Sequence, residues 1–324
     1  MTDGKAPDQV AAVIIGRNEG ARLVAGLRAA AGQVDQIVYV DSGSSDGSVQ
    51  AARDARADVI ALDMSRPFTA ARARNTGVDH LLAVNSDVGF VQFIDGDCEL
   101  QPDWIARART FLEMNPDVAV VCGRRRERFP QASVYNRLID EEWDTPVGEA
   151  LSCGGDALMR VAAFAQVGGY NPNLIAGEEP ELCVRLRSAG WKVWRLDAEM
   201  TLHDAALDRF GQWWKRNKRA GHAYAEGMSM HGQAPEYHWV RETRSAVVWG
   251  AVIPLVALLG VFLSPWSLLL LLALPLQIIR LGLRDGNWLR AAFVTLGKLP
   301  EAQGVLGYFW NRLRRVNTGL IEYK

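Results

Sequence analysis

The chain has 324 residues, of which 49% are hydrophobic and 23% are charged. This composition excludes an intrinsically disordered protein, and the length exceeds that of one minimal domain. The formal net charge of −1 gives the whole chain no basic excess with which to bind nucleic acid. The charge is unevenly distributed, because residues 205–324 carry 15 basic and 7 acidic side chains, whereas residues 1–204 carry 21 and 30. We therefore expect the two parts to face different partners.

The cysteines and the amino terminus indicate the compartment. Cys98, Cys122, Cys153 and Cys183 form no C-x-x-C pair, which argues against a zinc ribbon, a redox motif or a disulfide scaffold. A reducing compartment is the resulting expectation. The apolar run from Val10 to Ile15 is too short for the core of a signal peptide, so we interpret it as a buried strand.

Short apolar runs alternate with stretches of helical length through the first 120 residues. The runs predict strands at 10–15, 36–40, 59–62, 88–94 and 118–121, and the stretches between them predict helices at 23–31, 48–55, 70–84 and 104–114. This alternation favours βαβ crossovers and an α/β fold with a mostly parallel sheet. Residues 124–204 carry weaker strand signals and are expected to complete the same domain, with a helix that begins near Gly177.

Polar residues follow the predicted strands, at the edge where such sheets bind their ligands. They are Gly16–Glu19, Asp41–Gly47 and Asp95–Asp97. Asp95 and Asp97, with a glycine between them, can hold a divalent cation whose other ligands are water and phosphate oxygens. The alternative is an ordinary turn, because Asp and Gly are common turn formers.

Two further segments offer groups for binding an anion or a sugar. Asp41 directly ends a predicted strand, whereas Ser45 and Asp46 are equally explained as caps of the following helix. Arg72 and Arg74 lie in or before the helix predicted at 70–84, and we expect one of them to direct its guanidinium at a phosphate or base and the other to lie on the surface.

These segments together resemble the inverting family-2 glycosyltransferases of the GT-A fold, over roughly residues 10–204. The resemblance rests on five ordered segments: Ile14–Glu19, Val40–Gly47, Ala73–Gly77, Asp95–Asp97 and Gly177–Glu179. It implies a nucleotide-diphosphate sugar as donor, with Glu19 and Asp41 near the nucleoside, Arg74 in donor binding, Asp95 toward the ribose and Asp97 on the metal. Gly16-Arg17 and Ser42 depart from the usual family pattern, so the resemblance does not determine which nucleobase the donor carries.

The resemblance also implies roles in the reaction. Glycosyl transfer requires a base that takes the acceptor proton and a cation that neutralises the leaving diphosphate. The resemblance gives the base role to Glu179, with Glu178 beside it, and the cation is Mg²⁺ or Mn²⁺. His203 becomes a candidate metal ligand together with Asp97, and Gly155 and Asp156 become candidate acceptor-binding residues.

Each of these assignments has a structural alternative. The acidic pair at 178–179 also suits the first turn of a helix with Pro180 near its start, and Glu181 can pair with Arg185. A lone histidine is commonly structural, and Gly154-Gly155 is also compatible with a bulge.

An uncharged run of 34 residues extends from Ala246 to Ile279 and is interrupted by Ser264-Pro265-Trp266. One membrane crossing takes about 20 apolar residues, so this run predicts one over-long span or a hairpin that turns at Pro265. We prefer a hairpin, spanning or re-entrant, because arginines flank both ends of the run. The alternative is a buried helical hairpin of a soluble protein.

Aromatic and basic residues mix on both sides of the run, which is typical of helices at a membrane interface. We therefore predict four segments: a GT-A catalytic domain (1–204), interfacial helices (205–244), the hairpin (245–282) and an amphipathic end (283–324). Packed aromatic faces are the alternative for the interfacial segments.

The resulting hypothesis is a non-processive, metal-dependent, inverting hexosyltransferase on the cytoplasmic face of the inner membrane. Its acceptor would be a lipid-linked saccharide or another glycan. The Gln212–Arg216 segment has the wrong order for the Gln-x-x-Arg-Trp signature of processive synthases. The alternatives are a catalytically silent nucleotide-binding membrane scaffold and a metal-dependent nucleotidyltransferase.

Overall fold

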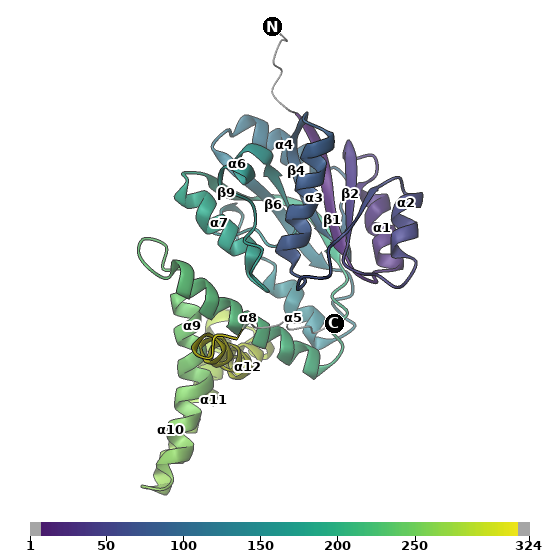
Figure 1. Ribbon diagram of the computed structural model, residues 1–324. Helices are drawn as coiled ribbons and strands as arrows, with labels where there is room; N and C mark the ends of the chain where they lie inside the picture. Colours follow the sequence, from purple (N-terminus) through teal and green to yellow (C-terminus); the bar gives the residue numbers. More distant parts are fainter. Residues whose placement is uncertain (1–7, 317–324) are drawn as a thin grey trace. The chain divides into compact units, whose positions relative to one another are not determined.

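The computed structural model describes residues 8–316, so the ends of the predicted 1–204 and 283–324 segments lie outside the described residues. The chain forms two compact units, Met1–Ala206 and Leu207–Lys324 (Figure 1). The amino-terminal unit is an α/β domain, and the described part of the carboxy-terminal unit is helical.

A mixed sheet forms the centre of the amino-terminal unit. Its strands are β1 (Gln9–Gly16), β2 (Gln36–Asp41), β3 (Asp58–Ala61), β4 (Val88–Asp95), β5 (Cys98–Leu100), β6 (Val118–Glu127), β7 (Gly148–Glu149), β8 (Ala157–Arg160) and β9 (Lys192–His203). Their order is β3-β2-β1-β4-β8-β6-β9-β5, with β7 on β9. The neighbours among β1 to β4 pair in parallel, as do β6 and β9, whereas β5, β7 and β8 pair antiparallel.

The helices of this unit are α1 (Ala21–Ala30), α2 (Ser48–Asp54), α3 (Ala70–Val84), α4 (Trp104–Met114), α5 (Val134–Glu142), α6 (Val161–Gln166) and α7 (Glu178–Ser188). Helix α3 packs on β1 and β2, and α4 packs on β6, β8 and β9. The close packing of α3 requires Gly77, because a Cβ there would lie 2.4 Å from Val13 Cγ1. The predicted α/β class with a mostly parallel sheet is confirmed, and β5, β7 and β8 are additions that the sequence analysis did not predict.

The carboxy-terminal unit consists of helical segments: α8 (Phe210–His231), α9 (Val240–Val247), the π-helical turn η1 (Val248–Val252), α10 (Ile253–Gly260), the 3-10 segment η2 (Pro265–Leu272), α11 (Ala273–Asp285) and α12 (Trp288–Leu313). Two stretches, Val240–Gly260 and Pro265–Asp285, are long and apolar enough to cross a membrane, by length and composition. The chain turns between them at residues 261–264, next to the Pro265 of the predicted hairpin.

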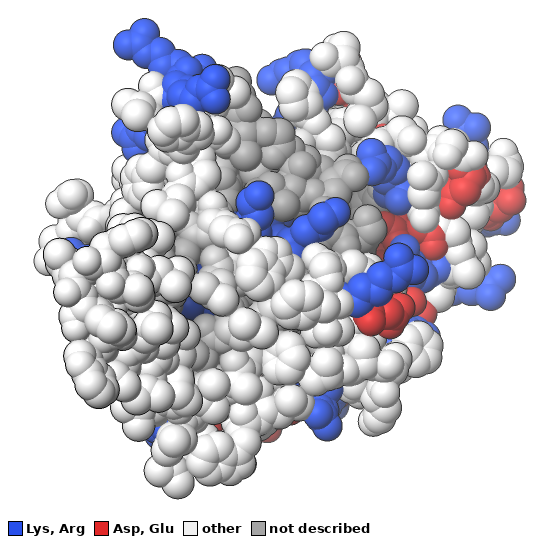
Figure 2. All heavy atoms as spheres, turned by 90° about the horizontal axis from the view of Figure 1, so that it is seen from below, with Lys and Arg blue, Asp and Glu red and all other residues white. Residues whose placement is uncertain are grey.

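The surface of this hairpin is strongly apolar. Leu259 is 62% exposed, Phe262 87% and Trp266 75%, and Figure 2 shows a broad area on this side of the molecule that is largely free of charged side chains. A core hairpin would bury these side chains within its own unit. The exposure is compatible with a membrane anchor.

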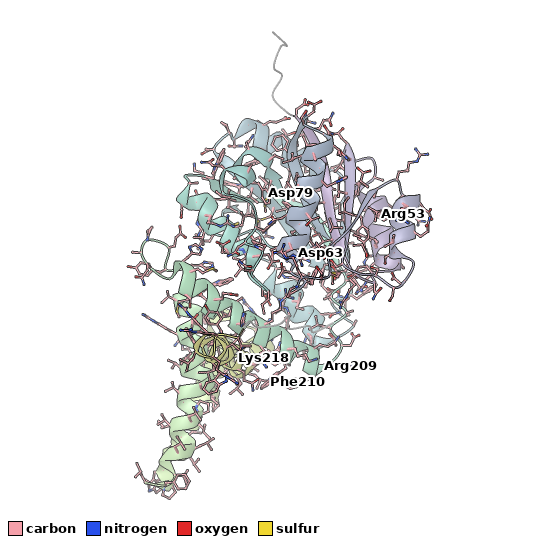
Figure 3. All side chains as sticks on the ribbon, viewed as in Figure 1. Arg53, Asp63, Asp79, Arg209, Phe210 and Lys218 are labelled. Atoms are coloured by element: carbon pink, nitrogen blue, oxygen red, sulfur yellow. The ribbon has the colours of Figure 1, made fainter. Side chains whose placement is uncertain are left out.

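Helix α8 carries aromatic side chains near its start and lysines and arginines farther along. Phe210 is 46% exposed and lies 5.4 Å from the Trp213 ring, centroid to centroid. Figure 3 marks Phe210 and Lys218 on this helix. The predicted role of this segment at a membrane interface stays a prediction.

Candidate active site

The carboxyl ends of β1, β2 and β4 lie together at one edge of the sheet. Their register places Gly16 beside Asp41 and Ile15 beside Asp95. Gly96 allows this close approach, because a Cβ there would lie 2.9 Å from Glu19 Cγ and 3.0 Å from the Ile15 carbonyl oxygen. The sequence-predicted Glu19, Asp41 and Asp95 therefore lie on neighbouring chain segments.

Asp41 is buried and organises the loop that follows it. One of its carboxylate oxygens accepts hydrogen bonds from the backbone N–H groups of Gly43 and Ser44, each at 3.0 Å. The other accepts from the Tyr39 hydroxyl at 3.2 Å. Glu19 forms an ion pair with Arg22 at 2.7 Å. Burial and the charges of Asp41 and Glu19 raise the pKa of Tyr39, so the tyrosine stays a neutral donor.

Arg74 joins two of the predicted site segments. It is only 2% exposed, and its guanidinium contacts Asp95 Oδ1 at 2.6 Å and Glu178 Oε1 at 2.7 Å. Burial lowers the pKa of Arg74, but the charges of Asp95 and Glu178 outweigh this effect and hold it above its ordinary value. Of the two candidate arginines, Arg72 instead donates to the carbonyl oxygens of Asp63, Arg66 and Pro67.

The predicted acceptor residues lie next to this bridge. A Cβ on Gly155 would lie 3.1 Å from both Arg74 Nη2 and Asp95 Oδ2. Asp156 is fully buried, accepts a hydrogen bond from the Asp95 backbone N–H at 3.0 Å and another from the Thr201 hydroxyl at 2.9 Å. This burial supports a positioning role for Asp156, and its contact with an acceptor stays a prediction.

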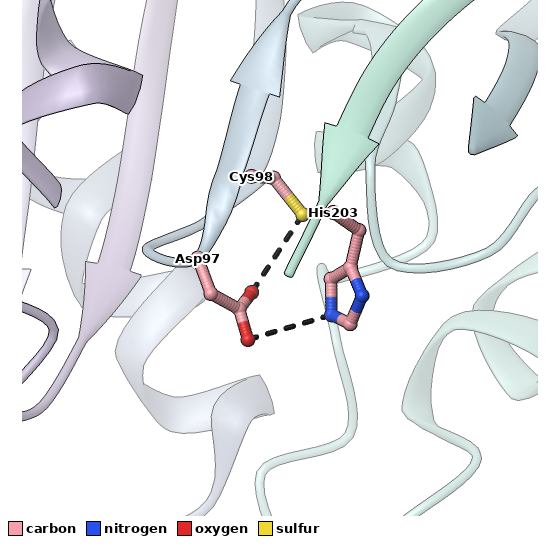
Figure 4. Close-up of side chains that lie close together, drawn as sticks. All are labelled: Asp97, Cys98 and His203. Carbon is pink, nitrogen blue, oxygen red and sulfur yellow. Dashed lines mark hydrogen bonds and ion pairs between the residues drawn. The ribbon is translucent and has the colours of Figure 1, made fainter. Parts of the chain in front are cut away.

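Asp97 and His203 are both buried and face each other at the end of β9 (Figure 4). Asp97 Oδ2 lies 3.4 Å from His203 Nε2, and its Oδ1 lies 3.7 Å from Cys98 Sγ. The other ring nitrogen of His203, Nδ1, lies 3.5 Å from Glu127 Oε2. Burial and the charge of Arg125 lower the pKa of His203, which favours the neutral imidazole.

These residues fit a divalent cation. A carboxylate oxygen and a neutral imidazole nitrogen that converge at 3.4 Å are groups of the type that bind metal ions, and a carboxylate on the far side of the histidine is the usual partner that fixes such a ring. One carboxylate with one imidazole suits Mn²⁺ and leaves most positions to water and phosphate oxygens. Asp97 and His203 would hold the ion.

Glu179 is 3% exposed and is surrounded by sulfur. Its Oε1 accepts a hydrogen bond from the Cys153 backbone N–H at 2.6 Å and lies 2.9 Å from the sulfurs of both Cys153 and Cys183. Burial raises the pKa of Glu179, although the donors around it oppose the shift. Glu178, the neighbouring candidate, is held in its ion pair with Arg74 instead.

Three contacts of the site were missed in the sequence analysis. Arg125 lies 3.2 Å from Asp95 Oδ2 and 4.7 Å from the centre of the Trp143 ring, and Glu127 faces His203. Arg125 and Glu127 belong to the end of β6, which continues past the predicted boundary at residue 121. The charged run 124–128 directly after an apolar strand is the signal that could have indicated them.

The arrangement is that of a GT-A fold, and a comparison with solved structures agrees. A mannosyltransferase structure from Pyrobaculum calidifontis, PcManGT in complex with GDP-Man and Mn²⁺, is similar with a TM-score of 0.65 and 17% identity, over 95% of this chain and 90% of that one. Residues 11–165 match the family model "Glycosyl transferase family 2". These residues are therefore similar to family 2 glycosyltransferase domains.

Two curated proteins are similar to this chain in sequence. The succinoglycan biosynthesis protein ExoA of Rhizobium meliloti (strain 1021) is 28% identical over 50% of this chain and 52% of its own length. A probable glucomannan 4-beta-mannosyltransferase of Oryza sativa subsp. japonica is 28% identical over 33% of this chain and 22% of its own length. The chain thus spans about half or less of these two curated relatives.

Proposed function

We propose that this protein transfers a hexose from a nucleoside-diphosphate sugar, with inversion, to an acceptor hydroxyl at the cytoplasmic surface of the inner membrane. The observation that carries the proposal is the Arg74 bridge, because it brings the end of β4 and the start of α7 to the same place as the Asp97–His203 pair. The names of the relatives, a mannosyltransferase and a polysaccharide biosynthesis protein, support a hexose as the transferred sugar.

In this proposal Glu19 and Asp41 bind the nucleoside, Asp95 contacts the ribose, and Arg74 holds the donor. Asp97 and His203 hold Mg²⁺ or Mn²⁺, which when bound neutralises charge on the departing diphosphate. Arg74 and Arg125 add fixed positive charge beside it, since both are held by Asp95 in a buried site.

Glu179 is proposed as the base that takes the acceptor proton. A base needs a raised pKa near the working pH, and burial shifts the pKa of Glu179 in that direction. Gly155 permits the acceptor to approach the Arg74–Asp95 pair. Attack from the face opposite the leaving group, with a single base, gives inversion of the anomeric carbon.

The acceptor is proposed to be lipid-linked because the exposed apolar hairpin is compatible with a membrane anchor. Arginines flank both ends of the hairpin, at 241 and 244 and at 280 and 284, which favours return to the cytoplasmic side.

The test is to incubate the purified full chain with a panel of nucleoside-diphosphate sugars, Mn²⁺ and membrane lipid extracts. We expect release of a nucleoside diphosphate from one donor and a product of inverted anomeric configuration. Release of inorganic pyrophosphate would instead identify a nucleotidyltransferase. Binding without turnover of any donor would identify a catalytically silent scaffold.

A further inference from the structure

Two thiols and one carboxylate meet on the side of α7 that faces the loop before β8. We call Cys153, Glu179 and Cys183 the thiol cluster. Glu179 and Cys183 lie one helical turn apart on α7, and Cys153 reaches them from the loop. The two sulfurs lie 3.9 Å from each other and 2.9 Å from the same oxygen of Glu179.

These separations suit a shared metal ion better than a disulfide. Two Zn–S bonds of about 2.3 Å at a tetrahedral angle hold their sulfurs about 3.8 Å apart. A disulfide needs an S–S distance of about 2.05 Å, so the sulfurs would have to move by nearly 2 Å. The observed 3.9 Å between the sulfurs therefore matches two thiolates on one ion. The 2.9 Å between each sulfur and Glu179 Oε1 is that of a thiol hydrogen bond, and it has to open to about 3.5 Å when the ion replaces the thiol protons.

We propose that Cys153, Glu179 and Cys183 bind Zn²⁺ and that this site is distinct from the Asp97–His203 site. Two sulfurs with one oxygen select a thiophilic ion, whereas Asp97 and His203 offer the harder donors that suit Mn²⁺. Binding forms two Zn–S bonds and one Zn–O bond, and each thiol releases its proton to solvent. No oxidant or reductant takes part.

The surroundings supply what such a site needs. A hydrogen bond from Cys153 lowers the pKa of Cys183, but desolvation and the charge of Glu179 outweigh it and raise this pKa to about 11, so the thiol is protonated until an ion displaces its proton. Cys153 is only partly buried, and Gly154 beside it has open space where a side chain would be. The ion can therefore enter from the Cys153 side.

The functional consequence rests on the proposed role of Glu179. A Zn²⁺ ion bound to the thiol cluster occupies the carboxylate that would take the acceptor proton. Zinc is thus expected to inhibit transfer without displacing Mn²⁺ from Asp97 and His203, and the inhibition is expected to be reversed by a zinc-selective chelator.

The test uses Cd²⁺ as the probe, titrated into the purified full chain in excess Mg²⁺, because Cd–thiolate bonds absorb in the ultraviolet. Wild type is expected to show the absorbance of two thiolates, complete at one equivalent. C153S and C183S are each expected to weaken Cd²⁺ binding on the order of 100-fold. C122S is the matched control, since Cys122 is a buried thiol outside both the cluster and the Asp97–His203 site, and it is expected to keep the full signal.

The outcomes separate this proposal from the proposed function. A wild-type titration without a thiolate band overturns the zinc site whatever the variants do, even if the chain transfers sugar normally. An unchanged band in folded C153S and C183S also overturns it. Zinc binding at the cluster that leaves transfer unaffected refutes the inhibition and removes Glu179 from the base role.

Discussion

Replacing Arg74 by methionine tests whether the Arg74 bridge holds the amino-terminal unit together. The variant removes a guanidinium that is 2% exposed, so Glu178 loses this cation and Asp95 keeps its ion pair with Arg125 at 3.2 Å. Removing one partner of a buried ion pair costs about 3–5 kcal/mol. The Asp95 and Glu178 side chains are 29% and 13% exposed, and Arg125 still faces Asp95, so part of this penalty is relieved and we expect the lower end, about 3 kcal/mol.

The expected loss is measurable as a thermal shift. For a unit of this size each kcal/mol lowers the melting temperature by about 3 °C, so Arg74→Met should melt about 9 °C below wild type. Arg74→Lys keeps the positive charge but loses the two-pronged guanidinium that contacts both carboxylates. Its melting temperature should therefore lie about halfway between those of wild type and Arg74→Met. The assay is the circular dichroism of the sheet in the full chain, because all strands among residues 8–316 lie in the amino-terminal unit.

Arg126→Met is the matched control for this experiment. Arg126 also pairs with a carboxylate, that of Glu199, at 2.8 Å, but both side chains are 48% exposed. Such surface pairs contribute about 1 kcal/mol or less, so this variant should melt within about 3 °C of wild type. Equal shifts for Arg74→Met and Arg126→Met would refute the reasoning that burial makes the Arg74 bridge strong.

Three further predictions concern the base, the metal and the anchor. Burial raises the pKa of Glu179 above its ordinary 4.5, so the stability that its protonated form contributes is complete below about pH 4.5 and is lost as the pH rises through the folded-state pKa. The melting temperature of wild type should therefore fall relative to that of E179Q over this rise in pH. Parallel curves of melting temperature against pH for the two proteins would contradict this. D97N should lower Mn²⁺-dependent transfer on the order of 1000-fold with an unchanged melting temperature, and near-wild-type turnover would exclude Asp97 as a ligand. L258K, in the apolar hairpin, should make membrane insertion about 3 kcal/mol less favourable and so move the chain out of the membrane fraction. M114K, at a 75% exposed methionine of the other unit, should leave the chain in that fraction. Equal fractionation of the two variants would argue against an anchor.

Much of the fold could be predicted from local patterns. The strands β1, β2 and β4 are visible because each buries a nearly continuous run of the chain, and the helix at 70–84 is visible because its buried residues recur at helical spacing. Strand β8 was not predicted because it depends on a partner far along the sequence: Ala157 of β8 lies opposite Phe93 of β4. Such pairing depends on tertiary contacts that no short window of sequence contains.

The site could be predicted in part for the same reason. Asp95, Asp97 and Asp41 follow strands that are easily recognised, so their convergence at one sheet edge follows from topology. The sulfur environment of Glu179 could not be foreseen, because Cys153 is brought to it by a loop without a recognisable pattern. Whether a carboxylate is solvated or buried among thiols depends on packing, and its pKa depends on that in turn.

The central claim is that the strand-end residues and the Asp97–His203 pair bind a nucleoside diphosphate and a divalent cation together. The most direct measurement is calorimetric titration of the full chain with GDP and with UDP, each with and without Mn²⁺. We expect at least one of them to bind about 10-fold or more tightly with Mn²⁺ in wild type, a coupling of about 1.4 kcal/mol, and D97N to lose this difference. Equal affinities with and without Mn²⁺ for both nucleotides in wild type would contradict the account.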